Sequence, residues 1–341
     1  MGIVGALDLH RSQITYQWQD LATGEVHRGR IVPGAREPLR AWLAGFEGAD
    51  AHFALEATTG WRFVVEELER AGCTPHLGDP AEISARRGPK RRAKTDRADC
   101  EHMTALLLQG RLPECWIPPP DILEARTLSR LRKALVEERR QWMQRIHAQL
   151  YHQGAPAPKS MATAAGRARI IDADLSPAGG TVLAVGLATL EHIEAEVSTL
   201  DRDLAVFARR HPGCRALRTL YGIGPITSVA ILTELGDCRR FSSSDHAVRY
   251  AGLDVTVYES NDRRAPGHLS RQGPAVLRWA LYEAAQCAAR PASPDHASFV
   301  QLAGRLGHNR ACLSMARKLC RRAHHLLREL GDDVFVPARA A

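Results

Sequence analysis

Residues 93–99 read Ala-Lys-Thr-Asp-Arg-Ala-Asp and predict the first turn of a helix that carries two carboxylates. Thr95 suits the N-cap because its hydroxyl can accept a hydrogen bond from a free backbone N–H of that turn, and apolar residues follow at helical spacing over 103–107. Positions i and i+3 share one helix face, so Asp96 and Asp99 should point in the same direction. Mg²⁺ commonly binds one or two carboxylates together with substrate phosphate oxygens, so this pair predicts a metal site. From this stretch alone, acids that merely favour the helix dipole explain the pattern equally well.

The segment just before this helix is strongly basic. Five of the seven residues from 86 to 92 are cations, namely Arg86, Arg87, Lys90, Arg91 and Arg92, and Lys94 follows them. The whole chain carries a formal net charge of +8 and has a pI of about 9.3. Because the positive charge is clustered, it favours a polyanionic partner over a role in solubility. We therefore predict that this basic strip and Lys94 contact nucleic-acid phosphates.

Composition predicts a soluble protein of the cytoplasm. A length of 341 residues suggests roughly two domains with ample apolar core. The eight cysteines form no C-x-x-C pair, so we expect reduced thiols rather than a zinc site or a disulfide framework. The chain has no run of about 18 apolar residues and no start typical of a signal peptide, so we expect no membrane partner. Walker A, H-E-x-x-H and a G-x-G-x-x-G after a strand are absent, which leaves nucleotide hydrolysis and zinc proteolysis without support.

The N-terminal part reads as a mixed α/β domain that begins with a meander. Hydrophobic periodicity predicts these elements in order: strands 3–9, 13–18 and 25–32, helix 36–46, strand 51–56, helix 61–71 and strand 73–77. Two of the strands end in an acid, Asp8 and Glu56. With Asp96 and Asp99 they make a set of carboxylates of the kind that holds two metal ions about 3.5–4 Å apart in phosphoryl transfer. A lone acid at the end of a strand is usually a turn residue, but the four acids in this order are a more specific pattern.

The middle of the chain predicts two helices and a connection between them. Residues 122–150 read as a long helix with an apolar stripe and a basic opposite face. Residues 154–186 are rich in Ala, Gly, Pro and Ser and predict a mobile connection. Apolar residues then recur at spacings of three and four from Leu190 to Phe207. This seam fits self-association and an antiparallel hairpin with the 122–150 helix about equally well.

A glycine turn in the C-terminal part predicts a nucleic-acid contact. Residues 217–235 read as a helix, a Gly-Ile-Gly turn and a second helix, similar to the helix-hairpin-helix element. In that element backbone N–H groups, here those of Gly222 and Gly224, meet a backbone phosphate. An ordinary tight turn between helices explains the same pattern. A last helix, over about 310–330, is strongly basic and also suits nucleic acid.

Ser270 lies in a loop just before a predicted helix over 274–288, for which Pro274 is a suitable first residue. Cations surround this serine in the sequence: Arg263, Arg264, His268 and Arg271. A serine in such a place is most often a turn or cap residue. The alternative is a nucleophile beside a phosphate whose negative charge those cations offset.

These stretches together resemble the DEDD-type transposases of bacterial insertion sequences (insertion sequence family 110), which are bridge-RNA-guided recombinases. The acids in Gly-Ala-Leu-Asp8-Leu-His, Phe-Ala-Leu-Glu56-Ala-Thr and Lys-Thr-Asp96-Arg-Ala-Asp99 are similar to the RuvC-like acidic tetrad of that family. Gly-Ile-Gly-Pro-Ile-Thr, Arg-Arg-Phe-Ser-Ser, Tyr-Ala-Gly-Leu and Leu-Ser270-Arg-Gln-Gly are similar to its second domain. The family commonly has an asparagine where Pro274 stands, so no side-chain role is carried over to that position.

The resemblance implies a fold of α/β plus α type. It implies an RNase H-like, RuvC-like catalytic domain over 1–115, a helical coiled-coil spacer over 120–210 and a mainly helical transposase domain over 211–332 with a catalytic serine. It also implies Mg²⁺ or Mn²⁺ at the acids, double-stranded donor and target DNA, and a structured noncoding guide RNA. Dimers that pair into tetramers and share active sites are implied as well. Such a protein would act on the bacterial nucleoid.

In the mechanism that the resemblance implies, Ser270 attacks the scissile phosphorus and forms a transient phosphoserine link. A covalent intermediate conserves phosphodiester energy for rejoining, which recombination needs and hydrolysis does not. Two rival functions remain open. A metal-dependent, structure-specific nuclease such as a junction resolvase would use the four acids and water without Ser270. A non-catalytic nucleic-acid-binding protein would need neither the acids nor the serine.

Overall fold

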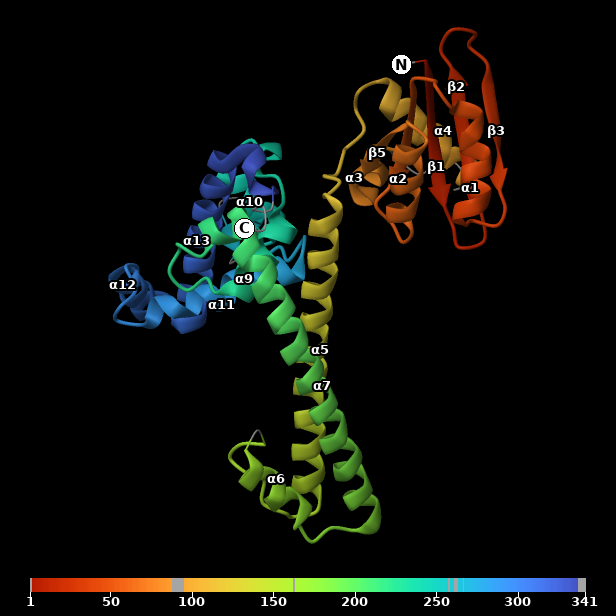
Figure 1. The fold of residues 1–341 in the computed structure, drawn as a ribbon. Coiled ribbons are helices and arrows are strands. Elements are labelled where there is room, and N and C mark those ends of the chain that lie inside the picture. Colours follow the sequence, from red (N-terminus) through yellow and green to blue (C-terminus); the bar gives the residue numbers. More distant parts are fainter. Residues whose placement is uncertain are drawn as a thin grey trace. The chain divides into compact units, whose positions relative to one another are not determined.

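The chain divides into two compact units, Met1–Ile117 (unit 1) and Pro118–Ala341 (unit 2), which Figure 1 shows in orange-red and in yellow to blue. This computed structural model describes residues 2–87, 95–161, 163–256, 258–260, 263–265 and 267–336, with the backbone alone for the two three-residue stretches. A mixed sheet in the N-terminal part followed by a mainly helical remainder was predicted from the sequence, and the structure confirms it.

Unit 1 is built on a five-stranded sheet with the order β3-β2-β1-β4-β5. The strands are β1 (Ile3–Leu9), β2 (Ile14–Asp20), β3 (Val26–Ile31), β4 (Ala51–Glu56) and β5 (Thr74–Gly78). The first three strands form an antiparallel meander, and β4 and β5 continue the sheet parallel to β1. The predicted meander is therefore present, and β1 lies at the centre with neighbours on both sides.

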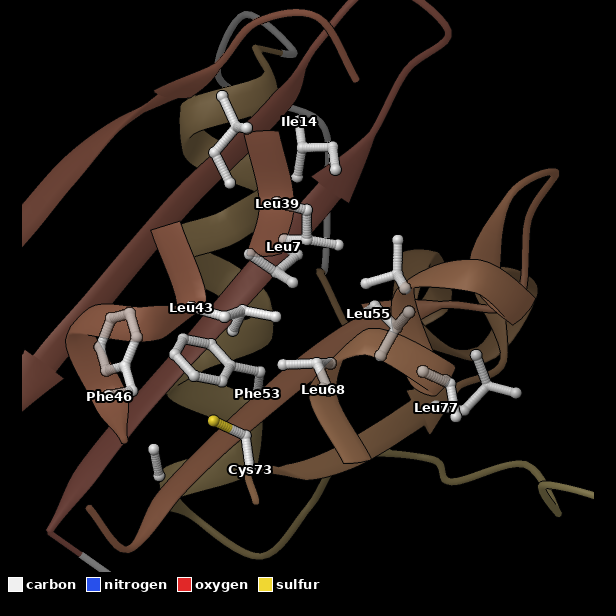
Figure 2. Packing of buried hydrophobic residues seen from close by; sticks show 14 residues of the cluster. Leu7, Ile14, Leu39, Leu43, Phe46, Phe53, Leu55, Leu68, Cys73 and Leu77 are labelled. Atoms are coloured by element: carbon white, nitrogen blue, oxygen red, sulfur yellow. The ribbon is translucent and has the colours of Figure 1, made fainter. Parts of the chain in front are cut away.

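Helices cover both faces of the sheet. Helices α1 (Arg36–Leu43) and α2 (Trp61–Arg70) pack on one face, where Leu7, Phe53 and Leu55 meet Leu39 and Leu68 in a closed apolar cluster (Figure 2). The other face, with Val4, Ala6 and Ala54, is covered by α3 (Pro80–Ala85) and α4 (Asp96–Leu108) through Ile83, Cys100, Met103, Leu106 and Leu107. Because successive side chains of a strand point to opposite faces of the sheet, β1 and β4 each contribute apolar residues to the cores on both faces.

Helix α4 begins where the sequence predicts. The Thr95 hydroxyl accepts a hydrogen bond from the Ala98 N–H at 3.2 Å, which confirms Thr95 as the N-cap. Asp96 and Asp99 both lie in the first turn of the helix. The cap therefore fixes where these two carboxylates stand relative to the sheet.

Unit 2 begins with an antiparallel helical hairpin of α5 (Pro120–His152) and α7 (Pro177–Arg210). Arg132 of α5 pairs with Asp201 of α7 at 2.5 Å, whereas Gly186 meets Ile146 nearer the other end. The apolar seam of α7 is buried from Leu190 through Leu204. Of the two explanations open at the sequence level, the structure contains the hairpin, so this seam is not a free surface for self-association.

The prediction of a mobile connection over 154–186 was wrong for much of that stretch. Helix α6 (Ala164–Ile171) lies within it, and α7 already begins at Pro177. Thr163 and Ser176 cap the two helices with their hydroxyls, and alanine, which is abundant here, is the best helix former. Ile170 and Leu183 are buried against Ile146 and Leu150 of α5, so packing stabilises both helices.

The rest of unit 2 is a helical domain attached to the hairpin. Its elements are α8 (Pro212–Leu217), α9 (Pro225–Leu235), α10 (Ser244–Tyr250), β6 (Tyr258–Ser260), β7 (Arg263–Ala265), α11 (Ala275–Gln286), α12 (His296–Leu306) and α13 (His308–Leu330). Short 3₁₀ turns lie at Cys238–Arg240, Cys287–Ala289 and Gly331–Val334 of this domain and at Ala44–Phe46 of unit 1. Helix α9 is its buried centre. Arg130 of α5 makes a bidentate ion pair with Glu234 of α9 at 2.6 and 2.8 Å, which ties the hairpin to this domain.

Across the part of the chain that the structure describes, none of the helices is both long and apolar enough to span a bilayer.

A buried carboxylate joins α1 to α2. The Glu67 side chain has no exposed surface, and Arg36, Arg40 and Arg70 each donate to it with an N–O distance of 2.6 Å. These hydrogen bonds, that of Arg40 foremost, lower the pKa of Glu67 from 4.5 to about 2, although burial opposes them. The cluster should therefore stabilise unit 1 wherever Glu67 is ionised.

We predict that Glu67→Gln lowers the free energy of unfolding of unit 1 by about 2 kcal/mol at neutral pH. This is less than the roughly 3–5 kcal/mol typical of a broken, fully buried pair, because the arginines are about half exposed. The contribution should be complete above the unfolded pKa of 4.5 and should fade as the pH falls toward about 2. Guanidinium unfolding followed by tryptophan fluorescence measures it.

The control is Glu69→Gln, which changes an exposed acid on the same helix and should alter stability by less than about 0.5 kcal/mol. A Glu67 variant that stays equally destabilised near pH 2.5 would contradict the assignment, because Glu67 of the unfolded chain is then protonated and most of its contribution to stability is already lost.

Candidate active site

Strand alternation places two of the predicted acids on one face of the sheet. Asp8 shares its face of β1 with Ala6, and Glu56 shares its face of β4 with Ala54. Both alanines pack against α4, so the two carboxylates project from the α4 side. Because β1 and β4 run parallel and in register, these acids come at the same end of neighbouring strands.

Helix α4 brings a third acid to this end of β1. Ligand atoms of Asp8, His10 and Asp96 all lie within 4.8 Å of one another. The His10 Nε2 atom is 3.2 Å from Asp8 Oδ2 and 3.5 Å from Asp96 Oδ1, and the Gln13 side-chain amide donates to Asp96 Oδ2 at 3.3 Å. Sequence analysis missed His10 and Gln13. The signal for His10 was its position two residues after Asp8 at the end of a strand.

The electrostatics of this cluster favour a cation. Burial raises the pKa of the Asp8 carboxyl, and the neighbouring Asp96 and Asp99 carboxylates raise it further, whereas His10 opposes the shift. Burial, followed by the charge of Asp8, also raises the pKa of the Cys100 thiol to about 12, so this thiol stays neutral. Carboxylates that repel one another in a partly desolvated place are stabilised when a divalent cation lies between them.

The other two predicted acids stand next to this group rather than in it. Asp99 is buried and forms an ion pair with Arg87 through its Oδ1 atom. Glu56 is half-buried and is not among the three residues whose ligand atoms converge. The structure therefore brings Asp8 and Asp96 together, whereas Asp99 lies three residues further along α4.

A basic hollow of about 510 Å³ adjoins Asp96. Its walls are Thr15, Tyr16, Arg28, Gly29, Arg30, Thr95, Asp96 and Arg97. Arg28 is oriented by a hydrogen bond of 2.7 Å from its Nε to Gln17 Oε1. Three guanidinium groups next to carboxylates suit a sugar–phosphate backbone that passes the cluster, since arginine is a common ligand of phosphate oxygens.

Most of the basic strip, namely Lys90, Arg91 and Arg92, lies outside the described residues, as does Lys94. The two described members both contact unit 1 itself. Arg86 donates to the Arg111 carbonyl, and Arg87 pairs with Asp99. The predicted phosphate contacts of the strip stay a prediction.

In unit 2, Ser270 lies in the loop before α11. Its hydroxyl donates a hydrogen bond to Asp254 Oδ1. The next residue, Arg271, has a positive φ of 53°, and Pro274 is the N-cap of α11 rather than its first helical residue. Asp254 was not predicted, because it lies 16 positions before Ser270.

The remaining predicted contacts of unit 2 have structural explanations or incomplete descriptions. Gly222 has a positive φ of 91°, and a Cβ there would come within 2.4 Å of the Ala284 carbonyl of α11. The Gly224 N–H already donates to the Thr227 hydroxyl at 2.9 Å. Arg263 and Arg264 lie in β7, of which the backbone alone is described. The nucleic-acid contacts of these residues remain predictions.

Comparison with known proteins identifies the family. A DEDD transposase model of the IS110 type matches residues 6–153, and a model described as the transposase IS116/IS110/IS902 family matches residues 214–301. The chain belongs to this transposase family. The first match contains Asp8, Glu56, Asp96 and Asp99, and the second contains Ser270.

Individual transposases are similar at low identity. The chain is 29% identical to transposase y4rJ of Sinorhizobium fredii over 64% of its own length and 60% of that protein, so it spans less than two thirds of this relative. It is 24% identical to a family 20 transposase of Pseudomonas aeruginosa over 70% of its own length and 71% of that protein. A transposase of the insertion element IS1111A from Coxiella burnetii matches at 25% over 36% of the chain.

The residues present fit the divalent metal that a DEDD-type family suggests. Asp8 and Asp96 converge with His10, and the pKa of Asp8 is raised by burial and by its acidic neighbours. Carboxylate oxygens suit Mg²⁺ and Mn²⁺, and an imidazole nitrogen is better tolerated by Mn²⁺. These family residues can therefore hold a hard divalent cation.

We predict that Mn²⁺ or Mg²⁺ at about 100 times its Kd stabilises the protein by about 2.7 kcal/mol, seen as a higher Tm than in chelator. Asp8→Asn should remove most of this shift, because it deletes one ligand charge from the converging group. Glu25→Gln, an exposed acid of the same unit, should keep it. An undiminished metal-dependent rise in Tm for Asp8→Asn would place the metal elsewhere.

Proposed function

We propose that this protein is the transposase of a bacterial insertion sequence, which cuts and rejoins DNA with the acids of unit 1 and Ser270 of unit 2. The observation that carries the proposal is the convergence of Asp8 and Asp96 beside a basic hollow. It occurs in a chain that belongs to a DEDD transposase family. Phosphoryl transfer uses carboxylates that hold metal ions together with cationic groups that stabilise the charge of the phosphate.

In this proposal Asp8, Glu56, Asp96 and Asp99 hold Mg²⁺ or Mn²⁺. The bound ion supplies Lewis-acid stabilisation of the scissile phosphate and of the leaving 3′ oxygen. Glu56 needs a side-chain movement to join the converged ligands, and Asp99 needs to exchange Arg87 for the metal. Arg28, Arg30 and Arg97 hold the backbone next to the scissile phosphate.

Ser270 is the proposed nucleophile. Its oxygen forms a bond to the phosphorus while the bond from phosphorus to the 3′ oxygen breaks, which leaves DNA joined to the protein through a phosphoserine. A 3′ hydroxyl of another strand then attacks the same phosphorus, and Ser270 is released. No water enters the sequence of steps, so the number of phosphodiester bonds is conserved.

The partners proposed are double-stranded donor and target DNA, a structured noncoding guide RNA and further copies of this chain. Base pairing with the guide would choose the sequence, while the protein would hold the helices by shape and charge. The dimer and tetramer proposed need surfaces other than the α7 seam, because α5 already covers it.

A water-using nuclease is the second candidate. The observation that favours it is that all four acids lie in unit 1, so a metal-dependent cut needs no residue of unit 2. Whether DNA cleavage requires Ser270 decides between the two functions.

We predict that the double variant Arg30→Ala and Arg97→Ala binds DNA more weakly and with a flatter salt dependence. The slope of log K against log[salt] should fall by about 0.9 for each phosphate that the variant no longer binds. Fluorescence anisotropy with a labelled duplex between about 50 and 200 mM salt measures the slope. The double variant Arg202→Ala and Arg209→Ala, at two exposed positions of α7, is the charge-matched control. An unchanged slope in the double variant would remove the hollow from the DNA path.

We predict that wild-type protein trapped during reaction carries DNA that resists boiling in detergent, and that Ser270→Ala forms no such adduct and exchanges no strands. Folding and DNA binding should survive, because the change removes one hydroxyl. A denaturing gel with labelled substrate and Mg²⁺ measures both. Ser242→Ala is the control, since Ser242 also bonds a potential base, His246, at 2.6 Å. If Ser270→Ala cuts DNA at the wild-type rate and wild type forms no adduct, the nuclease is the better assignment.

A further inference from the structure

The backbone around Ser270 fixes it opposite one carboxylate. The Ser270 N–H donates to the Asp254 carbonyl at 3.0 Å, and the Thr256 N–H donates to the His268 carbonyl at 2.8 Å. Between these two bonds, Val255 and Leu269 form an antiparallel bridge. Residues 254–256 and 268–270 are thus paired as in a short ladder, and Asp254 and Ser270 face each other across it.

The side chains of the pair are in contact. The Ser270 hydroxyl donates to Asp254 Oδ1, so the proton of the hydroxyl points at the carboxylate and a lone pair of the oxygen is left free. Both residues are half-buried, which leaves the serine reachable for a substrate. Within the described residues, no ion pair is formed by Asp254, so its charge is not neutralised by a direct partner.

Two glycines allow this arrangement. Gly252 has a φ of 65°, and a Cβ there would lie 2.1 Å from the Gln272 carbonyl. Gly273 has a φ of 89°, and a Cβ there would lie 1.9 Å from the Tyr250 carbonyl. The two segments can approach only because both positions lack a side chain, so the close pairing of Asp254 with Ser270 is built into the backbone.

Two arginine side chains bind the backbone just before Asp254. Arg317 of α13 donates to the Leu253 carbonyl at 2.6 Å, and Arg278 of α11 donates to the Ala251 carbonyl at 3.2 Å. Arg317 is close enough to Asp254 for their charges to interact, and Arg271 is close enough to Arg278. A phosphate that approaches Ser270 would therefore meet positive charge, which offsets its repulsion by the Asp254 carboxylate.

We propose that Asp254 is a catalytic residue that takes the proton of Ser270 during DNA cleavage and returns it during rejoining. The inference rests on the proposed serine mechanism and adds the group that activates the serine. A serine hydroxyl is a poor nucleophile unless a base accepts its proton. Protein kinases use an aspartate in this way for a hydroxyl that attacks phosphorus.

The steps balance in both directions. In cleavage the Ser270 oxygen bonds to phosphorus, its proton passes to Asp254 Oδ1, and the 3′ oxygen leaves with the electron pair of its bond and takes a proton from solvent. In rejoining, the incoming 3′ hydroxyl gives its proton to solvent and bonds to phosphorus. The serine oxygen then leaves and recovers its proton from the Asp254 carboxyl. Asp254 is therefore base in one direction and acid in the other, as microscopic reversibility requires.

The other groups near Ser270 fit this role less well. The His268 backbone is used by Thr256, and no hydrogen bond within the described residues joins the imidazole of His268 to Ser270. Arginines remain charged and cannot accept a proton. Of the groups that contact the Ser270 hydroxyl in the described part of the chain, Asp254 is the one that can act as a base.

The test compares Asp254→Asn with Asp254→Ala in the full chain with labelled DNA and Mg²⁺. Asparagine keeps an oxygen that accepts the Ser270 hydrogen bond but cannot take the proton, whereas alanine loses both functions. We expect both variants to bind DNA as the wild type does and to form the covalent adduct about 10²–10⁴-fold more slowly, the range typical of a lost general base. Asp245→Asn, which removes an exposed acid paired with Arg321 of α13, should leave the rate unchanged.

The outcomes separate this inference from the serine mechanism. If wild type forms the adduct and Asp254→Asn forms it within about threefold of the wild-type rate, Asp254 is not the base, even if Asp254→Ala is slow. If wild type forms no adduct, the serine mechanism itself fails and the inference fails with it. A Tm within a few degrees of wild type for Asp254→Asn shows that a slow rate comes from chemistry. If Asp254→Asn does not fold, an adduct formed by Asp254→Glu at a rate at or below the Asp254→Ala rate overturns the proposal.

Discussion

The packing of α4 on the central strand β1 is the interaction on which the acidic cluster depends. Cys100 and Met103 are fully buried against the face of the sheet that carries Ala6 and Ala54. That face also carries Asp8, so the packing that buries α4 brings its first turn to the end of β1. The burial that stabilises the domain also desolvates Asp8 and raises its pKa, a cost that a bound cation offsets. Stability and metal affinity therefore come from the same surface.

Much of unit 1 could be predicted from the sequence because its signals are local. The strands 3–9 and 51–56 match β1 and β4 residue for residue, since each is a short apolar run with a clear end. The Thr95 cap is likewise a property of a few neighbouring residues. His10 was missed because its position two residues after Asp8 becomes informative only when α4 is placed beside it.

Unit 2 was harder to predict because its contacts join distant residues. The stretch 154–186 has the composition of a linker, yet Ile170 and Leu183 find partners on α5 that no local pattern indicates. The α7 seam fits two partners equally until Arg132 and Asp201 are seen to pair. Asp254 and Ser270 lie 16 positions apart, and their hydrogen bond depends on glycines that allow two segments to approach. Ser270 could be singled out by resemblance to a family, whereas Asp254 could be recognised as its partner only from the folded structure.

The hairpin of α5 and α7 sets a fixed distance within unit 2. A helix of 33 residues is about 50 Å long, and α5 is anchored to α9 through Arg130 near its start and to α6 through Leu150 near its end. Two helices that pack along their length bend far less than one. The hairpin is therefore stiff, and the distance between its two ends is about the length of fifteen base pairs of duplex. Whatever the two ends of the hairpin contact is therefore kept at a separation of about 50 Å, which is set by the number of residues in the helix.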